Sequence, residues 1–444
     1  MNRGFQSHTL SQIVNDRISR IDTNLTKGNS SVIERINEVI VSETLRISRK
    51  FSQRAVMEAI VQNGPISRAS IAKQTGLSKQ TISEIVRQLE VDAWVRETGR
   101  TSGHVGRTAV TYELIPDAAY IAAVDLGGTK IRVAIADLAC QVFAEEVVPT
   151  DRRGGQFVVD QIADLCWQAA EHLKIPRARV RMAVIGAPGA PDAKTGRILL
   201  APNISGFDQM NVAAAFEEAL GIDVILENDV NLAVIGENWL GQGQGIDNLA
   251  FIAVGTGIGG GLMVGGQLVR GATNAAGELG FLPFGADPFD PESLRSGAFE
   301  RVVASIGIIE RYAVLTDQTI TVPAIFERAA AGDHQAGQVL DETAKYLARG
   351  IGAIAAIANP QKVIMGGSIG LRPELIERVR IFLPACFPYP IELEASQLGA
   401  RAAIVGAAAI GLSHLHNALF GADAPDSRMS LPPAEAVTFH EAVG

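Results

Sequence analysis

Three short segments of the chain contain residue types suited to binding phosphate groups and polyhydroxylated molecules. The first, Asp125-Leu-Gly-Gly-Thr-Lys130, places an acid at the end of an apolar stretch, followed by Gly127, Gly128 and Thr129. Glycines let backbone N–H groups approach a phosphate without interference from a Cβ atom, and a nearby carboxylate can hold a cation. A type I′ hairpin turn explains the same residues equally well, so this segment alone leaves both interpretations open.

The second segment, Gly255–Gly261, contains five glycines in seven residues and is predicted to be a loop. Its first residues, Gly255, Thr256 and Gly257, again combine glycines with a hydroxyl group. Two facing glycine turns can hold successive phosphates of one nucleotide. The second segment therefore favours phosphate binding over a simple hairpin for both turns.

The third segment, Glu227-Asn228-Asp229, follows the predicted buried strand Gly221–Leu226 at its carboxyl end. This is where α/β proteins place ligand-binding groups. A carboxylate there could deprotonate a sugar hydroxyl for attack on a phosphoryl group, while Asn228 bonds a neighbouring hydroxyl. The same residues can cap the helix predicted over Val230–Trp239, and the two roles are compatible.

A separate segment near the N-terminus has the pattern of a helix-turn-helix. A helix from Phe51 must end at Asn63-Gly64-Pro65; Ser67 and Ser78 can cap two further helices, and Gly76 ends the first of these. Apolar residues at spacings of three, four and seven form the inner face of the last helix: Ile82, Ile85, Val86 and Leu89. Three helices with a tight turn between the last two predict a helix-turn-helix.

Two predicted strands, Trp94–Thr98 and Ala109–Leu114, follow these helices and enclose the basic stretch Gly99–Arg107, which predicts a wing. Residues 45–107 carry 11 Lys/Arg against 5 Asp/Glu, although the whole chain has a net charge of −9. This local positive charge favours DNA binding over an ordinary solvated surface. The expected DNA-contacting residues are Lys79, Gln80, Thr81, Ser83 and Arg87 on the third helix, and Arg100, His104 and Arg107 on the wing.

The remainder of the chain alternates predicted strands and helices. The hairpin around Gly127 and a second hairpin of the same design around Gly255 each begin an α/β half, which predicts a duplicated body with a cleft between two lobes. The predicted units are an N-terminal extension that is partly helical (1–50), a winged helix-turn-helix (51–115), a first lobe (118–240), a second lobe whose C-terminal helix packs back on the first (241–414), and a flexible tail (415–444).

Length and composition narrow the class of protein. The chain has 444 residues and only three cysteines, widely spaced, which excludes a disulfide scaffold and a cysteine-rich zinc finger. The longest apolar stretch, Ala402–Leu412, is shorter than a membrane-spanning helix, and Met1–Leu10 lacks the apolar core of a signal peptide. We therefore expect a cytoplasmic protein with no membrane partner.

Taken together, these motifs resemble the ROK family of sugar-responsive repressors and sugar kinases. The winged helix, DLGGTK and ENDVN are joined by GAPG (Gly186–Gly189), APN (Ala201–Asn203), GTGIGGG and AAGELG (Ala275–Gly280), in the family's order. The resemblance implies a body with the actin/hexokinase-like (ribonuclease H-like) fold. The DNA-binding segment resembles the family's repressor branch, and free-standing kinases lack it.

The resemblance also implies roles for individual residues. Asp229 matches the family's catalytic base, and Gly366-Gly367 matches its adenosine-side loop, although a plain strand-to-helix turn explains these glycines equally well. The positions that match sugar ligands are Asn203, Asn228, Asp229, Glu278 and Glu300. The positions that match nucleotide phosphate contacts are Asp125, Gly127, Gly128, Thr129, Lys130, Gly255, Thr256, Gly257, Gly366 and Gly367.

The sequence departs from the zinc-containing relatives next to the sugar site. Where those relatives have a histidine that touches sugar and metal, this chain has Phe281, and Gly285–Glu300 contains no cysteine or histidine. Zinc therefore has no soft ligands there, and we expect none. Core packing that compensates for the absent metal is the favoured explanation of Phe281, ahead of sugar stacking.

These observations lead to one principal interpretation and two alternatives. We expect a sugar-responsive transcriptional regulator, most simply a repressor, that binds an inverted-repeat operator as a homodimer or homotetramer and requires no cofactor. The first alternative is an ATP-dependent sugar kinase that carries a DNA-binding domain, with Mg-ATP bound at the glycine turns. The second is a DNA-binding protein whose body serves only oligomerisation.

Overall fold

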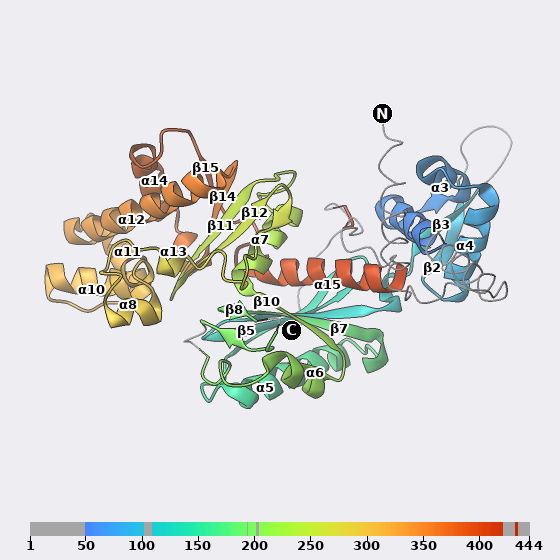
Figure 1. Ribbon diagram of the computed structural model, residues 1–444, viewed down its shortest axis with the longest axis horizontal. Coiled ribbons are helices and arrows are strands. Elements are labelled where there is room, and N and C mark those ends of the chain that lie inside the picture. Colours follow the sequence, from blue (N-terminus) through green and yellow to red (C-terminus); the bar gives the residue numbers. More distant parts are fainter. Residues whose placement is uncertain (1–48, 102–108, 193, 201–203, 421–430, 434–444) are drawn as a thin grey trace, which may run out of the picture. The chain divides into compact units, whose positions relative to one another are not determined.

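The computed structural model of the protein describes residues 49–101, 109–192, 194–200, 204–420 and 431–433 (Figure 1). The predicted helix-turn-helix is confirmed: a helix over residues 49–63 is followed by α3 (Arg68–Thr75) and α4 (Lys79–Val91). The side chain of Ser67 accepts a hydrogen bond from the Ser70 N–H, and that of Ser78 accepts one from the Thr81 N–H. The α4 residues Ile82, Ile85, Val86 and Leu89 are buried.

The wing strands complete this module. The sheet has the order β1-β3-β2, with β1 (Ile66–Ser67) and β2 (Val95–Thr101) both antiparallel to β3 (Ala109–Leu114). The two-residue strand β1 was not predicted, because its length leaves no periodicity to detect. The predicted wing residues His104 and Arg107 lie outside the described residues, as does the N-terminal extension up to residue 48.

Two five-stranded sheets of the same design form the body, as the predicted duplication requires. The first has the order β10-β7-β4-β5-β6 and the second β13-β12-β11-β14-β15. In each sheet, the first strand of the opening hairpin pairs in parallel with a later strand, and that strand pairs in parallel with the next one along the chain. The strands of the first sheet are β4 (Tyr120–Leu126), β5 (Lys130–Asp137), β6 (Val142–Pro149), β7 (Val180–Ala187) and β10 (Asp223–Asn228); those of the second are β11 (Leu249–Val254), β12 (Ile258–Val264), β13 (Gln267–Leu268), β14 (Lys362–Gly366) and β15 (Glu392–Ala395).

Helices cover both faces of these sheets. In the first lobe, α5 (Gly155–His172) and α6 (Val212–Leu220) pack on one face, and α15 (Ala402–Phe420) packs on β4 and β7 from the other (Figure 1). Helix α7 (Asp229–Leu240) contacts strands of both sheets. The remaining elements are β8 (Ala190–Pro191), β9 (Ile198–Leu199), α8 (Pro291–Ser296), α9 (Glu300–Val303), α10 (Ser305–Thr316), α11 (Val322–Ala330), α12 (His334–Ala358), α13 (Gly367–Gly370) and α14 (Pro373–Phe382), with short 3-10 turns that include Leu279–Phe281.

Helix α15 is apolar because it lies inside the fold. By length and composition the segment Gly399–Phe420 could cross a membrane, but 67% of its most apolar window is buried within the protein. Its contact with α7 is very close: a Cβ atom on Gly406 would lie 1.8 Å from the Leu232 carbonyl oxygen, and one on Gly236 would lie 2.2 Å from that of Ala402. Glycines are needed where two helix backbones approach this closely.

The predicted tail begins too early. Helix α15 continues past His414 to Phe420, and Leu415, His416 and Phe420 are buried. The ring of Phe420 packs edge-on against Trp94, with 5.5 Å between the ring centroids. The boundary was misplaced because burial in this part of α15 depends on long-range packing, such as that of Phe420 on Trp94.

The predicted glycine loop Gly255–Gly261 is also corrected. Only Gly255–Gly257 form the turn, whereas Gly259, Gly260 and Gly261 belong to β12 and pair with β11. A Cβ atom on Gly259 would lie 2.8 Å from a Val230 methyl group, and one on Gly261 would lie 2.7 Å from the Val230 carbonyl oxygen. These glycines therefore allow β12 to pack against α7.

Candidate functional site

One cavity of about 260 Å³ brings together residues from all three segments singled out in the sequence. Its wall is mainly made of glycine turns and carboxylates. It includes Gly127, Gly128, Thr129, Asn228, Asp229, Gly255, Thr256, Gly257, Glu278, Glu300 and Gly367. Lys130 and Gly366 are not part of this wall, and Asn203 lies outside the described residues.

Asn228 and Asp229 lie where β10 ends and α7 begins. The side-chain oxygen of Asn228 accepts hydrogen bonds from Val230 N–H (2.9 Å) and Asn231 N–H (3.0 Å), so the predicted helix cap is confirmed. The Asn228 amide nitrogen donates to the Gly189 carbonyl at 2.9 Å. Since an amide nitrogen carries two hydrogens, one remains to donate to a ligand in the cavity.

The carboxylates of the first lobe have raised pKa values. Burial raises the pKa of Asp229 to about 6. Asp125, at the end of β4, has its pKa raised to about 7 by burial and by the nearby charge of Asp229. Asp125 does not line this cavity; with Asp229 and Ser368 it lines a second cavity beside it. A carboxylate with a pKa near 6 accepts a proton more readily than a solvated one and can also accept hydrogen bonds from hydroxyl groups.

The second lobe contributes two more carboxylates. Burial, together with the charges of Asp229 and Glu300, raises the pKa of Glu278 to about 7. Burial also raises the pKa of Glu300, whose Oε2 accepts a hydrogen bond from Ile258 N–H at 2.9 Å. Because Ile258 directly follows the turn Gly255–Gly257, Glu300 joins the acidic wall to the second glycine turn.

Both glycine turns are hairpin turns and parts of the cavity wall at once. The first is closed by a hydrogen bond from Gly127 N–H to the Lys130 carbonyl (2.9 Å), and the second by one from Gly255 N–H to the Gly257 carbonyl (2.9 Å). A Cβ atom on Gly257 would lie 2.6 Å from Oε2 of Glu300, so any side chain at this position would displace the Glu300 carboxylate. Gly366 has a packing role, since a Cβ atom there would lie 2.2 Å from the Phe251 ring.

An ion pair that the sequence patterns did not reveal joins the two lobes beside the cavity. Nε of Arg270 lies 2.7 Å from Oε2 of Glu227, which is buried. The other carboxylate oxygen of Glu227 accepts from Asn228 N–H and from the Asn231 side chain, both at 3.0 Å. Arg270 begins the segment that leads to Glu278, so the pair ties sugar-site residues of both lobes together. No local pattern signals such a contact.

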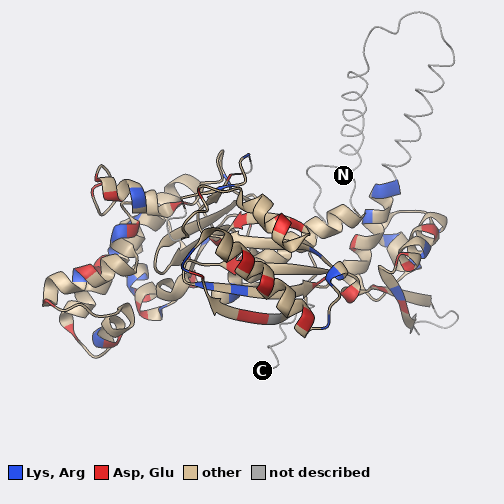
Figure 2. Ribbon diagram, turned by 90° about the horizontal axis from the view of Figure 1, so that it is seen from below, with Lys and Arg blue, Asp and Glu red and all other residues tan. Residues whose placement is uncertain are grey.

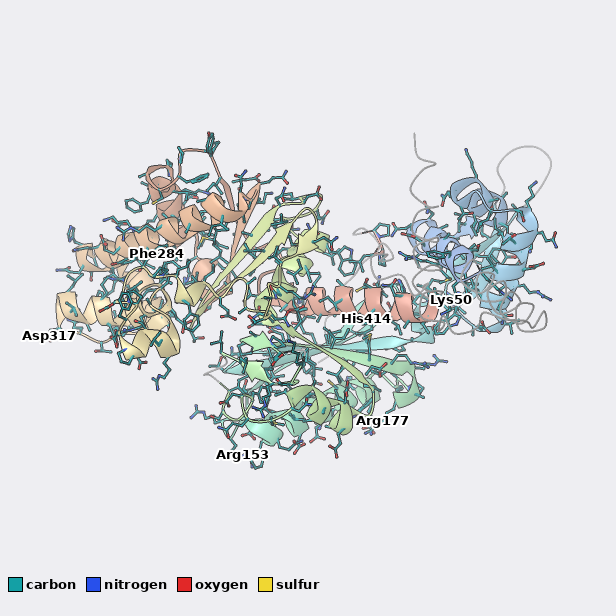
Figure 3. All side chains as sticks on the ribbon, in the orientation of Figure 1. Lys50, Arg153, Arg177, Phe284, Asp317 and His414 are labelled. Atoms are coloured by element: carbon teal, nitrogen blue, oxygen red, sulfur yellow. The ribbon has the colours of Figure 1, made fainter. Side chains whose placement is uncertain are left out.

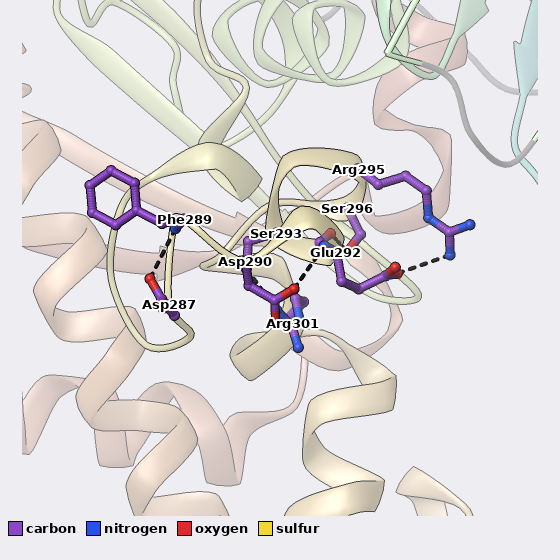
Figure 4. A network of polar contacts seen from close by, with 8 residues as sticks. All are labelled: Asp287, Phe289, Asp290, Glu292, Ser293, Arg295, Ser296 and Arg301. Carbon is purple, nitrogen blue, oxygen red and sulfur yellow. Dashed lines mark hydrogen bonds and ion pairs between the residues drawn. The ribbon is translucent and has the colours of Figure 1, made fainter.

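The segment before Glu300 is fixed by a polar network rather than by metal ligands (Figure 4). Asp290 caps α8 by accepting from Glu292 N–H at 2.9 Å. Nη1 of Arg301 donates to Asp290 (2.8 Å) and to Ser293 (2.7 Å). Within the part of the chain that the structure describes, no group of three or more His, Cys, Asp or Glu could hold a metal ion. The residues present therefore do not fit a zinc ion.

Phe281 and Arg295 are further cavity-lining residues beside this network. Phe281 ends the 3-10 turn Leu279–Phe281 and remains 39% exposed, so it does not fill the core as the favoured prediction held. The Arg295 guanidinium bonds Glu292 at 2.9 Å. Arg295 was missed because nothing in its sequence surroundings marks it as facing a cavity.

The predicted recognition helix presents its polar face to solvent. On α4, Lys79, Gln80 and Arg87 are exposed, and Thr81 and Ser83 are half-buried. Arg100 lies in β2 with its backbone opposite Val110. Basic and acidic residues are interspersed along the described ribbon (Figure 2).

A winged helix-turn-helix joined to a duplicated α/β body with an acid-lined cavity defines a DNA-binding protein that carries a small-molecule site. A sequence model of the ROK family matches residues 121–413, and a model of winged helix-turn-helix DNA-binding domains matches residues 52–92. The chain belongs to the ROK family.

Relatives of two kinds resemble the chain. The xylose repressor of Caldicellulosiruptor bescii is 26% identical over 87% of this chain and 98% of its own length. A glucokinase of Halalkalibacterium halodurans is 32% identical, but over only 55% of this chain and 79% of its own. Among solved structures, a ROK family transcriptional regulator described as a homologue of the E. coli MLC protein has a TM-score of 0.66 at 23% identity, covering 84% of this chain and 98% of that one; it supports the fold.

Proposed function

We propose that the protein is a sugar-responsive transcriptional repressor of carbohydrate-metabolism genes. The main support for this function is that one chain contains both a winged helix-turn-helix and an acid-lined cavity of monosaccharide size. The similarity to xylose repressors extends through both parts, whereas similarity to the glucokinase covers about half of the chain. The DNA-binding module gives sugar binding an output that needs no turnover.

On the DNA side, we assign base contacts to residues near the N-terminus of α4. Lys79 and Gln80 are exposed on its first turn, the part of a recognition helix that reaches base edges. Thr81, Ser83 and Arg87 continue this face, and Arg100 and Arg107 serve as phosphate or minor-groove contacts. One winged helix reads too few base pairs for useful specificity, so we expect a homodimer or homotetramer on an inverted repeat.

On the sugar side, Asn228, Asp229, Glu278 and Glu300 bind hydroxyl groups, and Asn203 joins them. Asp229, Glu278 and Glu300 have raised pKa values because they are buried and poorly solvated. A hydroxyl donor that bonds them therefore displaces little water, and the desolvation cost of binding is small. No metal is required at this site. The protein is expected to act in the cytoplasm, where operator DNA and free sugar are both accessible.

A second candidate function, ATP-dependent sugar phosphorylation, is favoured by one specific observation. Asp229 has a pKa of about 6, suitable for a general base, and the same cavity holds both glycine turns. In that case Asp229 would take the proton of the attacking hydroxyl while the turns at Gly127 and Gly255 hold the phosphates of Mg-ATP. We rank this second, because catalysis is not needed for a regulator's response.

The experiment that tests the proposal measures DNA binding and ATP consumption with the same protein. Operator duplexes are selected from random DNA with the full chain, and fluorescence anisotropy then follows binding during titration with monosaccharides. A repressor of this kind shows a sugar-dependent change in operator affinity without ATP. Unchanged operator affinity with every sugar, together with sugar-dependent ATP hydrolysis that Asp229→Asn abolishes without loss of sugar affinity, would establish the kinase instead.

A further inference from the structure

Phe281 is an aromatic ring exposed in a cavity that is otherwise built of carboxylates and glycines. The turn Leu279–Phe281 buries its first two residues, Leu279 and Gly280, and leaves Phe281 39% exposed on the cavity wall. The turn directly follows Glu278, and the Phe281 N–H donates to the Glu278 carbonyl at 3.2 Å. The Phe281 ring and the Glu278 carboxylate therefore lie on the same part of the cavity wall.

Core packing in this region is carried out by other rings. Phe284, labelled in Figure 3, packs edge-on against the buried Phe299, with 6.0 Å between ring centroids and an interplanar angle of 85°. Among the described residues, Phe281 has no aromatic or cation-π partner of this kind. A large apolar side chain left uncovered inside a binding cavity is typical of a ligand contact.

The chemistry of the wall limits the ligand. Asp229, Glu278 and Glu300 accept hydrogen bonds and repel anions, and among the described residues they outnumber the one cation in the wall, Arg295, whose guanidinium also bonds Glu292. An aromatic face attracts C–H groups, whose hydrogens carry partial positive charge. A pyranose ring offers both surfaces at once, with hydroxyl groups around its edge and C–H groups on its faces.

We propose that Phe281 stacks on the C–H face of a neutral sugar ring and thereby selects unphosphorylated, uncharged monosaccharides as effectors. This inference rests on the proposed sugar-binding function and deepens it by naming the class of sugar and the residue that selects it. A cavity of about 260 Å³ suits one sugar ring, since pockets for larger, drug-sized ligands begin near ~300 Å³.

The test is isothermal titration calorimetry of the full chain with D-xylose, D-glucose, D-glucose 6-phosphate and D-glucuronate. Phe281→Leu removes the aromatic face but keeps an apolar side chain, and Phe281→Trp keeps an aromatic face. Phe289→Leu is the matched control, because Phe289 is 89% exposed on the neighbouring segment and does not line the cavity.

We expect Phe281→Leu to weaken binding of the preferred neutral sugar about three- to tenfold, Phe281→Trp to retain most of the affinity, and Phe289→Leu to match the wild type. Apo melting temperatures should stay close to the wild type in all three variants, because neither phenylalanine fills the core. Equal sugar affinity in Phe281→Leu and wild type overturns the stacking role. Tighter wild-type binding of D-glucose 6-phosphate or D-glucuronate than of the neutral sugars overturns the selection of uncharged sugars. Wild type that binds none of the four compounds overturns the sugar-responsive function itself, and with it this inference.

Discussion

The recognition helix and the sugar cavity hold their functional side chains in opposite ways. On α4 the polar residues such as Lys79 and Gln80 are exposed, while the buried residues Ile82 and Leu89 stabilise the helix from the other face. In the cavity, Asp229 and its neighbours are carboxylates whose charged forms are disfavoured by burial. Substitutions on the polar face of α4 should therefore change binding and leave stability almost unaltered, whereas substitutions of the buried cavity carboxylates should change both.

The largest expected effect comes from the inter-lobe ion pair. Arg270→Ala leaves Glu227, whose side chain is 6% exposed, without its cationic partner. Removing one partner of a buried pair costs about 3–5 kcal/mol; because the Arg270 side chain is still 35% exposed, we expect about 2–3 kcal/mol in urea unfolding. Sugar affinity should fall as well, since Asn228 and Glu278 lose their mutual positioning.

The matched control is Arg96→Ala in the winged helix. Arg96 pairs with Glu113 at 2.8 Å, but 56% of its side chain is exposed, and exposed pairs contribute about 0–1 kcal/mol. If Arg270→Ala loses no more stability than Arg96→Ala, the Arg270–Glu227 pair does not stabilise the cavity between the lobes.

The next effect concerns Asp229. The raised folded-state pKa values of Asp125, Asp229 and Glu278 mean that ionising these groups favours unfolding. Their contribution to stability is complete below pH ~4, the range of the unfolded-state pKa values, and is lost as the pH rises through about 6–7. Asp229→Asn should therefore make the apoprotein more stable than wild type at pH 8, while the difference shrinks toward pH 4.

The same variant should weaken sugar binding by about 1.5–3 kcal/mol, or roughly 10- to 150-fold, because a charge-assisted hydrogen bond is lost. Sugar should then shift operator affinity less than in wild type. Thermal unfolding at pH 8 and pH 5, with anisotropy on operator DNA, measures both effects. If the Asp229→Asn apoprotein is less stable than wild type at pH 8, the ionised Asp229 carboxylate does not destabilise the folded state.

Substitutions in the winged helix should change DNA affinity about as much as Asp229→Asn changes sugar affinity, and they distinguish base contacts from phosphate contacts. Lys79→Ala or Gln80→Ala should cost about 1–3 kcal/mol of operator affinity and relax sequence preference, with stability within about 0.5 kcal/mol of wild type. Arg100→Ala and Arg107→Ala should weaken binding to all DNA sequences. Each should also reduce the slope of log K against the logarithm of the salt concentration by about one. Unchanged operator affinity and selectivity in both α4 variants would show that another surface reads the DNA.

The two regions also differ in how far sequence predicts them. The caps at Ser67 and Ser78 act on residues only three positions away, so the helix-turn-helix could be located from local pattern. The cavity motifs could be identified singly, and the family's order indicated that they meet. The partner of Glu227, the exposure of Phe281 and the burial of Phe420 depend on contacts between distant segments, which no local periodicity encodes.

The smallest expected effect is that of removing metal ions. The segment before Glu300 is fixed by Arg301, which bonds Asp290 and Ser293, and it offers no thiolate or imidazole ligand. Treatment with EDTA should therefore leave the melting temperature and sugar affinity unchanged, and elemental analysis should find well under one zinc per chain. Arg301→Met, by contrast, should lower stability by about 1 kcal/mol, because the Arg301 side chain is 30% exposed and its bonds are only partly shielded from water. One zinc per chain, lost together with sugar binding on chelation, would show that a metal and not this polar network orders the sugar side of the cavity.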